Sequence, residues 1–151
     1  MARVAIALGS NLGDRRAHLE WAITRLGEVL THLRASTLIE TEPVGVPDEQ
    51  PPYLNAVVVG ETELEPEALL EHLMALEHGR GRQRRSFRAA RTLDLDVILY
   101  GDRIIHTDTI EIPHPRFRER EFVLRPLAEL APEWIDPVTG KMVEGLLRDM
   151  T

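Results

Sequence analysis

Residues 91 to 101 read RTLDLDVILYG, and the rest of the chain is arranged around this stretch. Apolar side chains occupy every second position, which predicts a half-buried β-strand. The face opposite this apolar row carries Asp94 and Asp96. Two residues of strand rise roughly 6.6 Å, so we expect both carboxylates to project from the same side. The apolar row expected to face the core is Leu93, Leu95, Val97 and Leu99.

Two carboxylates on one strand face are suited to a pair of divalent cations about 3.5 to 4 Å apart. Without a cation or a basic neighbour the two charges would repel, and one carboxyl would tend to bind a proton. Basic neighbours precede the strand: Arg80, Arg82, Arg84, Arg85, Arg88 and Arg91. Carboxylates, metal and clustered guanidinium groups together are typical of a polyphosphate site. Each feature alone also fits a solvated surface, so the interpretation depends on their combination.

The chain has 151 residues, a formal charge of −7 and no cysteine. This length predicts one domain, residues 1–151, with a sizeable core. The lack of cysteine excludes disulfides and thiolate zinc sites, and it fits a reducing cytoplasm. The acidic charge argues against a general nucleic-acid binder. The first apolar run is too short for a signal peptide or membrane span, so we expect a cytoplasmic protein that binds neither nucleic acid nor membrane.

Positive charge is concentrated in arginine, which accounts for 17 of the 18 basic residues. Arginine offers phosphate a planar fork of donors that lysine lacks. A second group, Arg116, Arg118 and Arg120, lies beyond the central strand. Two arginine patches in an acidic chain predict a small anionic ligand that is held locally.

The remaining patterns predict a ferredoxin-like fold of the α+β class, an antiparallel sheet with helices packed on one face and extra C-terminal helices. The other face would then be free for a site. A proline-rich segment from Thr41 to Pro52 is expected to form a long irregular loop. The expected strands are 3–8, 33–40, 53–61 and the central one, followed by a hairpin turn at Gly101 into 103–106. The expected helices begin at Asp14 and at Pro66, with short ones near 126–130 and 143–150.

Several side chains outside the central strand are candidates for chemistry. His114 lies between two prolines that restrict its backbone, which makes it a candidate hydrogen-bond donor to phosphate or else a solvated residue. Tyr53 and Phe122 flank irregular segments where a flat heterocycle could stack, and Asn55 could bond its edge. Glu77 lies beside the apolar face of the second helix, from which it is expected to reach solvent. No Walker A, G-x-S-x-G or HExxH sequence occurs.

The motifs RTLDLDVILYG and IPHPRFREREFVL resemble the paired signature of the 6-hydroxymethyl-7,8-dihydropterin pyrophosphokinase family of folate biosynthesis. The resemblance extends from the GSNLGD loop through TEPVG and Tyr53-Leu54-Asn55 to the PLAELAPEW segment, and so covers nearly the whole chain. It implies transfer of the terminal diphosphate of ATP to the hydroxymethyl group of the pterin, with release of AMP. It also implies two Mg²⁺ ions, a ferredoxin-like α/β sandwich, and a protein expected to act as a monomer on small-molecule substrates.

The resemblance also implies roles for particular residues. Asp94 and Asp96 would hold both metal ions, and together with Arg82 and Arg91 they would form the catalytic set. The ATP site would comprise Glu77, Arg82, Arg84, Arg91, Val97, His114 and Arg120. The pterin site would comprise Thr41, Val44, Tyr53, Asn55 and Phe122.

The chain departs from the family pattern before the signature arginine, where Phe87 and Arg88 stand in place of an aromatic followed by Gly-Pro. Which of the two covers the pterin is left open. Two other classes of protein share parts of this pattern. A nucleotidyltransferase would carry its Gly-Ser close to the D-x-D, whereas Gly9 lies more than eighty residues upstream. An RNA-recognition domain would place aromatics and basic residues on the central strands, where this chain has aspartates.

Overall fold

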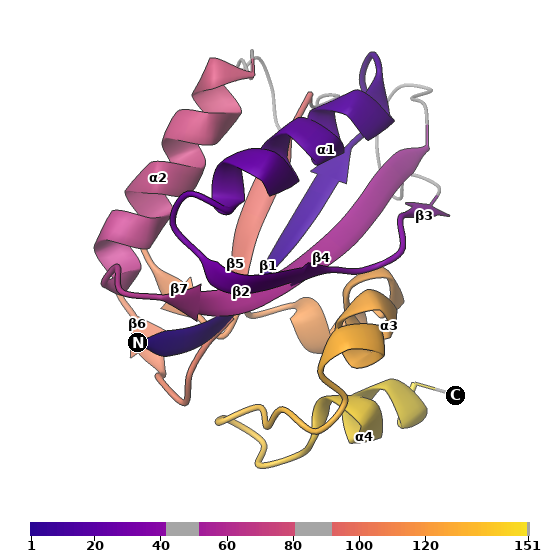
Figure 1. Ribbon diagram of the computed structural model, residues 1–151. Coiled ribbons are helices and arrows are strands. Elements are labelled where there is room, and N and C mark those ends of the chain that lie inside the picture. The colour runs from indigo at the N-terminus through magenta and orange to yellow at the C-terminus, as the bar shows by residue number, and fades with distance from the viewer. Residues whose placement is uncertain (42–51, 81–91, 151) are drawn as a thin grey trace.

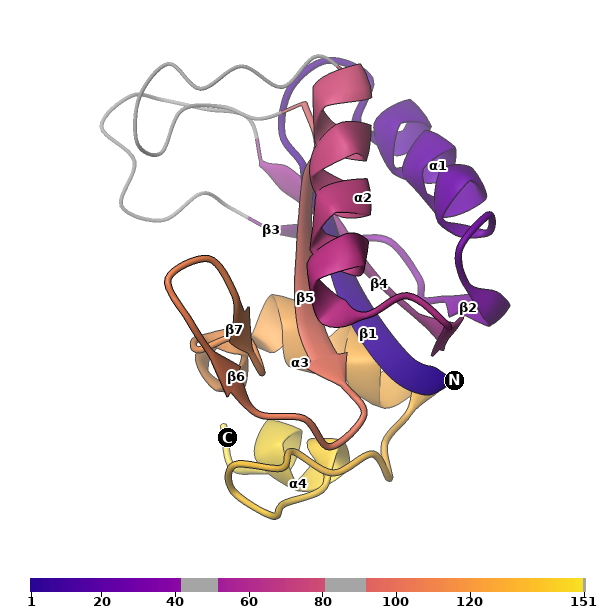
Figure 2. The ribbon, with the colours of Figure 1, turned by 90° about the vertical axis from the view of Figure 1, so that its left-hand side faces the viewer.

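A computed structural model describes residues 1–41, 52–80 and 92–150 of the chain (Figures 1 and 2). Its antiparallel sheet has the order β2-β4-β1-β5, and β3 pairs with part of β4. The strands are β1 (Ala2–Ser10), β2 (Thr31–Ala35), β3 (Ile39–Thr41), β4 (Tyr53–Thr62) and β5 (Asp94–Tyr100). The helices α1 (Arg15–Leu26) and α2 (Pro66–Gly79) connect strands within this order. The strand-helix-strand-strand-helix-strand order confirms the predicted ferredoxin-like fold.

Helices α1 and α2 pack on one face of the sheet, and their local sequence explains where each begins. Asp14 accepts a hydrogen bond from the Ala17 amide at 3.1 Å, so it caps α1 as predicted. Pro66 occupies the first turn of α2, where no backbone donor is required. The buried residues beneath these helices form the first core, which includes Ile6, Leu19, Val58, Leu73 and Leu95.

The opposite face of the sheet is not free along its whole length. Helices α3 (Glu121–Leu130) and α4 (Val143–Arg148) build a second core with it, and α3 lies on the side of the sheet away from α1 (Figure 1). This core includes Ala5, Val57, Ile98, Phe117 and Leu124. The sequence predicted these C-terminal helices but not their place on the sheet, and only the end of this face beyond α3 remains for a site.

A β-bulge in β5 changes the predicted alternation. Ile6 pairs with Val97 and Ala5 pairs with Leu99, so Ile98 is an extra residue. The predicted apolar row is therefore wrong at Leu99, which packs with Ile98 in the second core. The freed carbonyl of Ile98 accepts a hydrogen bond from the His114 amide at 3.1 Å. The bulge thus attaches the segment around His114 to the central strand.

Two other predicted strands differ from the structure. The strand expected over 33–40 is divided into β2 and β3. The turn at Gly101, where φ is +54°, is present, but it does not make a hairpin with β5. The strand that follows it, β6 (Ile105–His106), pairs with β7 (Glu111–Ile112) in a separate small sheet.

A buried ion pair holds the C-terminal segment to the 3-10 helix η1 (Phe117–Glu119). The Arg118 guanidinium donates two hydrogen bonds to Asp136, one of them at 2.9 Å, and the Asp136 side chain is 0% exposed. Burial alone would raise the pKa of Asp136, but the hydrogen bonds from Arg118, Thr139 and the Val138 amide outweigh it, and the pKa is lowered. Asp136 is therefore charged at neutral pH.

We predict that Arg118→Met lowers the free energy of unfolding by about 3 kcal/mol at pH 7, because it leaves a buried carboxylate unpaired. The loss should shrink below about pH 4, because the wild-type protein loses the contribution of the pair as pH falls through the lowered pKa of Asp136. Urea unfolding at pH 7 and pH 3.5 measures both. The control is Arg125→Met, which removes an exposed pair with Glu121. Equal losses in the two variants would contradict the prediction.

Candidate active site

Strand register brings the predicted site residues onto one face of the sheet. Gly9 of β1 pairs with Asp94 on one side and with Asn55 on the other. Tyr53 of β4 pairs with Thr41 of β3. Directly paired residues project to the same face, and side chains two apart on a strand share that face. The predicted residues Asp94, Asp96, Tyr53, Asn55 and Thr41 therefore lie on the face away from α1 and α2.

The Asn55 side chain and the Tyr53 ring lie close above Gly9, and the place where these three residues meet is named the recess. Asn55 is 5% exposed and donates from Nδ2 to the Thr41 hydroxyl at 2.8 Å, which fixes the orientation of its amide. A β-carbon on residue 9 would lie 3.2 Å from Asn55 Oδ1 and 3.5 Å from Tyr53 Cδ1. Glycine at this position therefore allows the amide and the ring to approach the sheet. The recess offers a flat ligand one aromatic face and one oriented amide.

The two aspartates of β5 are half-buried, with Leu95 buried between them on the opposite face. Their partners on β1 are Gly9 and Ala7. Carboxylate oxygens suit Mg²⁺, which keeps several waters or phosphate oxygens as further ligands. Within the described ranges, no group of three acidic, histidine or cysteine side chains could hold an ion. Two carboxylates would leave the remaining positions around such an ion to water or phosphate oxygens.

Glu77 differs from its expected exposure. Its side chain is buried, and Oε2 accepts a hydrogen bond from the Leu95 amide at 2.7 Å. Because β5 is at the edge of the sheet formed by the described residues, this amide has no strand of that sheet on its outer side. Glu77 thus fixes the backbone between the two aspartates. The expectation that it reaches solvent is wrong, because a long-range backbone partner of this kind leaves no sign in the local sequence.

His114 is held as a neutral imidazole beside the carboxylates. The pKa of His114 is lowered from 6.5 to about 4, first by burial and then by the charges of Arg120 and Arg116, while the charge of Asp94 opposes the shift. The Arg116 amide donates to Nδ1 at 3.1 Å, so the ring proton is on Nε2. The ring therefore presents one N–H donor at neutral pH.

The second arginine group has divided roles. Arg118 is used in the ion pair with Asp136, whereas Arg120 lies at the start of α3 with its guanidinium carbon 5.7 Å from the Phe122 ring centre. Phe122 is partly buried against the second core. Arg120 and Phe122 thus form one unit near His114, whose pKa is lowered by the charge of Arg120.

Other predicted residues are not brought to this face or lie outside the described residues. The Val97 side chain is buried in the first core, so only its backbone is left for ATP. Arg80 donates from Nε to His18 Nδ1 at 2.8 Å and stacks on Trp21, which ties the end of α2 to α1. The candidates outside the described residues are Val44, Arg82, Arg84, Phe87, Arg88 and Arg91.

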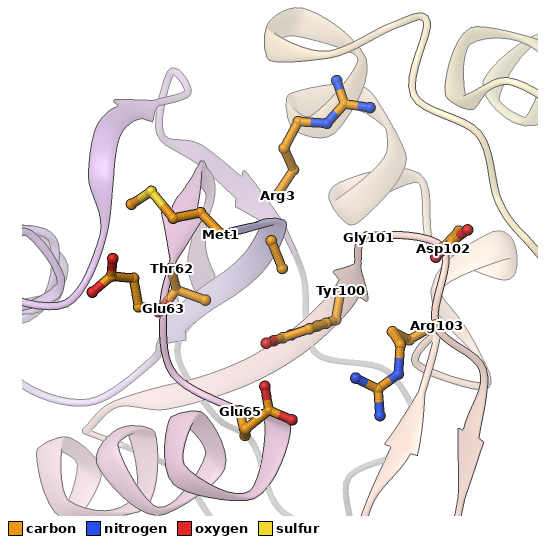
Figure 3. A pocket seen from close by; sticks show the side chains of 10 residues that line it. Met1, Arg3, Thr62, Glu63, Glu65, Tyr100, Gly101, Asp102 and Arg103 are labelled. Atoms are coloured by element: carbon orange, nitrogen blue, oxygen red, sulfur yellow. The ribbon is translucent and has the colours of Figure 1, made fainter.

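A cavity of about 640 Å³ lies at the other end of the sheet (Figure 3). There the Tyr100 hydroxyl donates to the Leu64 carbonyl at 2.6 Å. The cavity is lined by the start of β1 and the ends of β4 and β5, so it is separate from the aspartates. Its charged side chains are Arg3, Glu63, Glu65, Asp102 and Arg103.

The fold and the site define a ferredoxin-like domain with two carboxylates, a neutral histidine and an aromatic–amide recess on one sheet face. The family model for 7,8-dihydro-6-hydroxymethylpterin-pyrophosphokinase matches residues 5–132. The chain therefore belongs to this family, and it is an ATP-dependent pyrophosphokinase of folate biosynthesis.

Relatives in several organisms agree. The 2-amino-4-hydroxy-6-hydroxymethyldihydropteridine pyrophosphokinase of Synechocystis is 40% identical over 96% of this chain and 74% of its own length. The same enzyme of Haemophilus influenzae is 42% identical over 91% of this chain and 86% of its own.

Other matches are to longer proteins. The folic acid synthesis protein fol1 of Pneumocystis carinii is 41% identical, but the match covers only 18% of its length. The wild-type HPPK-DHPS structure of Plasmodium falciparum shares the fold with a TM-score of 0.77 at 15% identity, and 44% of that chain is covered. Among the helices of the described ranges, none has both the length and the apolar character needed to cross a bilayer.

We predict that the His114 ring titrates with a midpoint near pH 4, which NMR of the ring protons measures. The unfolded chain binds this proton near pH 6.5, whereas the folded chain binds it only near pH 4. The free energy of unfolding should therefore decrease as the pH is lowered from 6.5 to 4. His114→Gln should remove that part of the pH dependence, whereas the control His106→Gln, at an exposed position, should retain it. A ring midpoint near 6.5 would contradict the prediction.

Proposed function

We propose that this chain, as one catalytic domain of residues 1–151, transfers the terminal diphosphate of ATP to the hydroxymethyl group of 6-hydroxymethyl-7,8-dihydropterin. The products would be AMP and the pterin diphosphate. The observation that carries the proposal is the pairing of Gly9 with both Asn55 and Asp94, which puts a recess for a flat heterocycle next to a pair of carboxylates.

Asp94 and Asp96 would hold two Mg²⁺ ions, with phosphate oxygens and water as the other ligands. The ions, when bound, would neutralise charge that develops on the transferred diphosphate. Glu77 keeps the backbone of this stretch in place through its bond to the Leu95 amide at 2.7 Å. The carboxylates therefore need little rearrangement when metal and nucleotide arrive.

The neutral His114 would donate its Nε2–H to a phosphate oxygen, and Arg120 would add positive charge. A neutral donor keeps its hydrogen bond over the whole range of pH above its pKa, which is about 4. Arg82, Arg84 and Arg91 remain proposed phosphate ligands by their place in the family motif. We assign no separate general base, because a phosphate oxygen of the substrate can take the proton of the hydroxyl group.

For the pterin, Asn55 would bond the ring edge, and Tyr53 and Phe122 would enclose its faces. The hydrogen bond from Asn55 to Thr41 at 2.8 Å fixes which amide atoms remain for the ligand. Val44 remains a proposed backbone contact. Location in the cytoplasm and action as a monomer also stay predictions.

The first test is product identification after mixing the protein with ATP, Mg²⁺ and 6-hydroxymethyl-7,8-dihydropterin. AMP together with a pterin diphosphate would support the proposal. ADP would indicate transfer of a single phosphoryl group, and pyrophosphate would indicate a nucleotidyltransferase. Either of these products would overturn it.

We predict that Asp96→Asn lowers kcat by about a thousandfold or more, because it removes a charged ligand that stabilises the transition state. The melting temperature should stay near that of the wild type, since the side chain is only half-buried. The matched control is Asp102→Asn, an exposed aspartate in the turn after β5. Wild-type turnover by a correctly folded Asp96→Asn protein would refute the metal assignment.

We also predict that Gly9→Ala weakens binding of the pterin by about tenfold, because the added methyl group displaces Asn55 or Tyr53 from the recess. Affinity for ATP should change little. Isothermal titration of each ligand measures both. The control is Gly145→Ala, whose new methyl group would meet only Arg148 Nη2 at 3.9 Å. Unchanged pterin affinity in Gly9→Ala would show that the recess is not the pterin site.

A further inference from the structure

We propose that Arg15 is a positioning residue for the pterin site, which it serves by holding β3 against β4 at Thr41 and Tyr53. This inference rests on the proposed function, because it concerns the substrate of that same site. Arg15 is the first residue of α1 and is not among the buried residues by which this helix packs on the sheet. The proposed role is therefore additional to helix packing.

The Arg15 guanidinium lies where the two strands end. Its Nη1 donates to the Pro52 carbonyl at 2.7 Å and contacts Glu40 Oε1 at 2.7 Å. Glu40 directly precedes Thr41, and Pro52 directly precedes Tyr53. Because Thr41 and Tyr53 pair with each other, Arg15 binds both strands beside the pair that borders the site.

Strand β3 needs such support because it is short. It has three residues, Ile39–Thr41, each paired only with β4 in the described sheet. A charge-assisted hydrogen bond is stronger than a neutral one, and the Arg15 side chain is only 28% exposed, which limits screening by water. Arg15 therefore supplies a contact that the short ladder alone does not.

The effect of Arg15 on the site would pass through Thr41 to Asn55. The Thr41 hydroxyl accepts the bond from Asn55 Nδ2 at 2.8 Å, and this bond sets the direction of the Asn55 amide. If β3 separates from β4, the acceptor moves and the amide is free to rotate. The pterin site would then have to be ordered at each binding event, which lowers affinity.

The neighbouring arginine provides a matched control. Arg16 has the same charge and lies in the same helical turn, but it pairs with Glu20 at 3.4 Å and is 68% exposed. Its replacement removes one positive charge without touching β3 or β4. Any effect that depends only on net charge should therefore appear in both variants.

The experiment compares the wild-type protein with Arg15→Ala, Arg16→Ala and Glu40→Gln. For each protein, titration gives the Kd of the pterin, with and without a non-hydrolysable ATP analogue, and the Kd of the analogue alone. Steady-state kinetics give KM for the pterin and kcat. Hydrogen exchange at Ile39–Thr41 reports on the β3 ladder, and exchange within α1 reports on the helix.

We expect Arg15→Ala to raise the Kd and KM for the pterin by about tenfold, with the Kd of the ATP analogue unchanged within twofold. Exchange at β3 should accelerate while α1 stays protected. Glu40→Gln, which retains a hydrogen-bond acceptor, should show a smaller change in the same direction, and Arg16→Ala should match the wild type.

Two results would overturn the positioning role while leaving the proposed function intact. One is wild-type pterin affinity in Arg15→Ala. The other is weakened ATP binding in Arg15→Ala, which would place Arg15 among the phosphate ligands. A wild-type protein that neither binds the pterin nor turns it over would instead overturn the proposed function, and the positioning role with it.

Discussion

The position of Gly9 in the sheet is the constraint on which the site depends. This residue pairs with Asn55 in β4 and with Asp94 in β5, so one register joins the two halves of the site. A slip of one residue on either side would turn the amide or the carboxylates to the face covered by α1 and α2. The apolar residues that fix the register, such as Ile6 and Val58, are buried in the first core. Core packing therefore determines the geometry of the site.

Electrostatics at the site depend on burial as much as on the number of charges. Glu77 is buried, and its carboxylate accepts a hydrogen bond from the Leu95 amide of β5. His114 is kept neutral by burial and by the charge of Arg120, although Asp94 favours its protonation. A cationic imidazole at this place would compete with a metal ion for the carboxylates. The neutral ring instead avoids this competition and keeps one fixed N–H donor for an anion.

The structural features that the sequence predicted correctly are those determined by the order of neighbouring residues in the chain. Strand periodicity placed both aspartates on one face, and the cap at Asp14 located the start of α1. The parts that were missed depend on distant partners. The bulge at Ile98 follows from how β5 meets β1, and nothing in an apolar run marks which residue is the extra one. Arg118 belongs to the second arginine group, for which the sequence predicted an anionic ligand, but it pairs with Asp136, eighteen residues further on. Burial of Glu77 likewise depends on an amide of another element.

Helix α1 links these observations, because residues of its first turn contact three other parts of the fold. Arg15 binds Glu40 and Pro52, at the ends of β3 and β4, and His18 accepts a hydrogen bond from Arg80 at the end of α2. The pKa of His18 is lowered by burial and then by the charge of Arg80, which keeps its Nδ1 an acceptor. The apolar face of α1 is anchored in the first core, so these polar contacts start from a fixed base. A helix on the far side of the sheet can thus hold the ends of strands whose other face carries the proposed site residues.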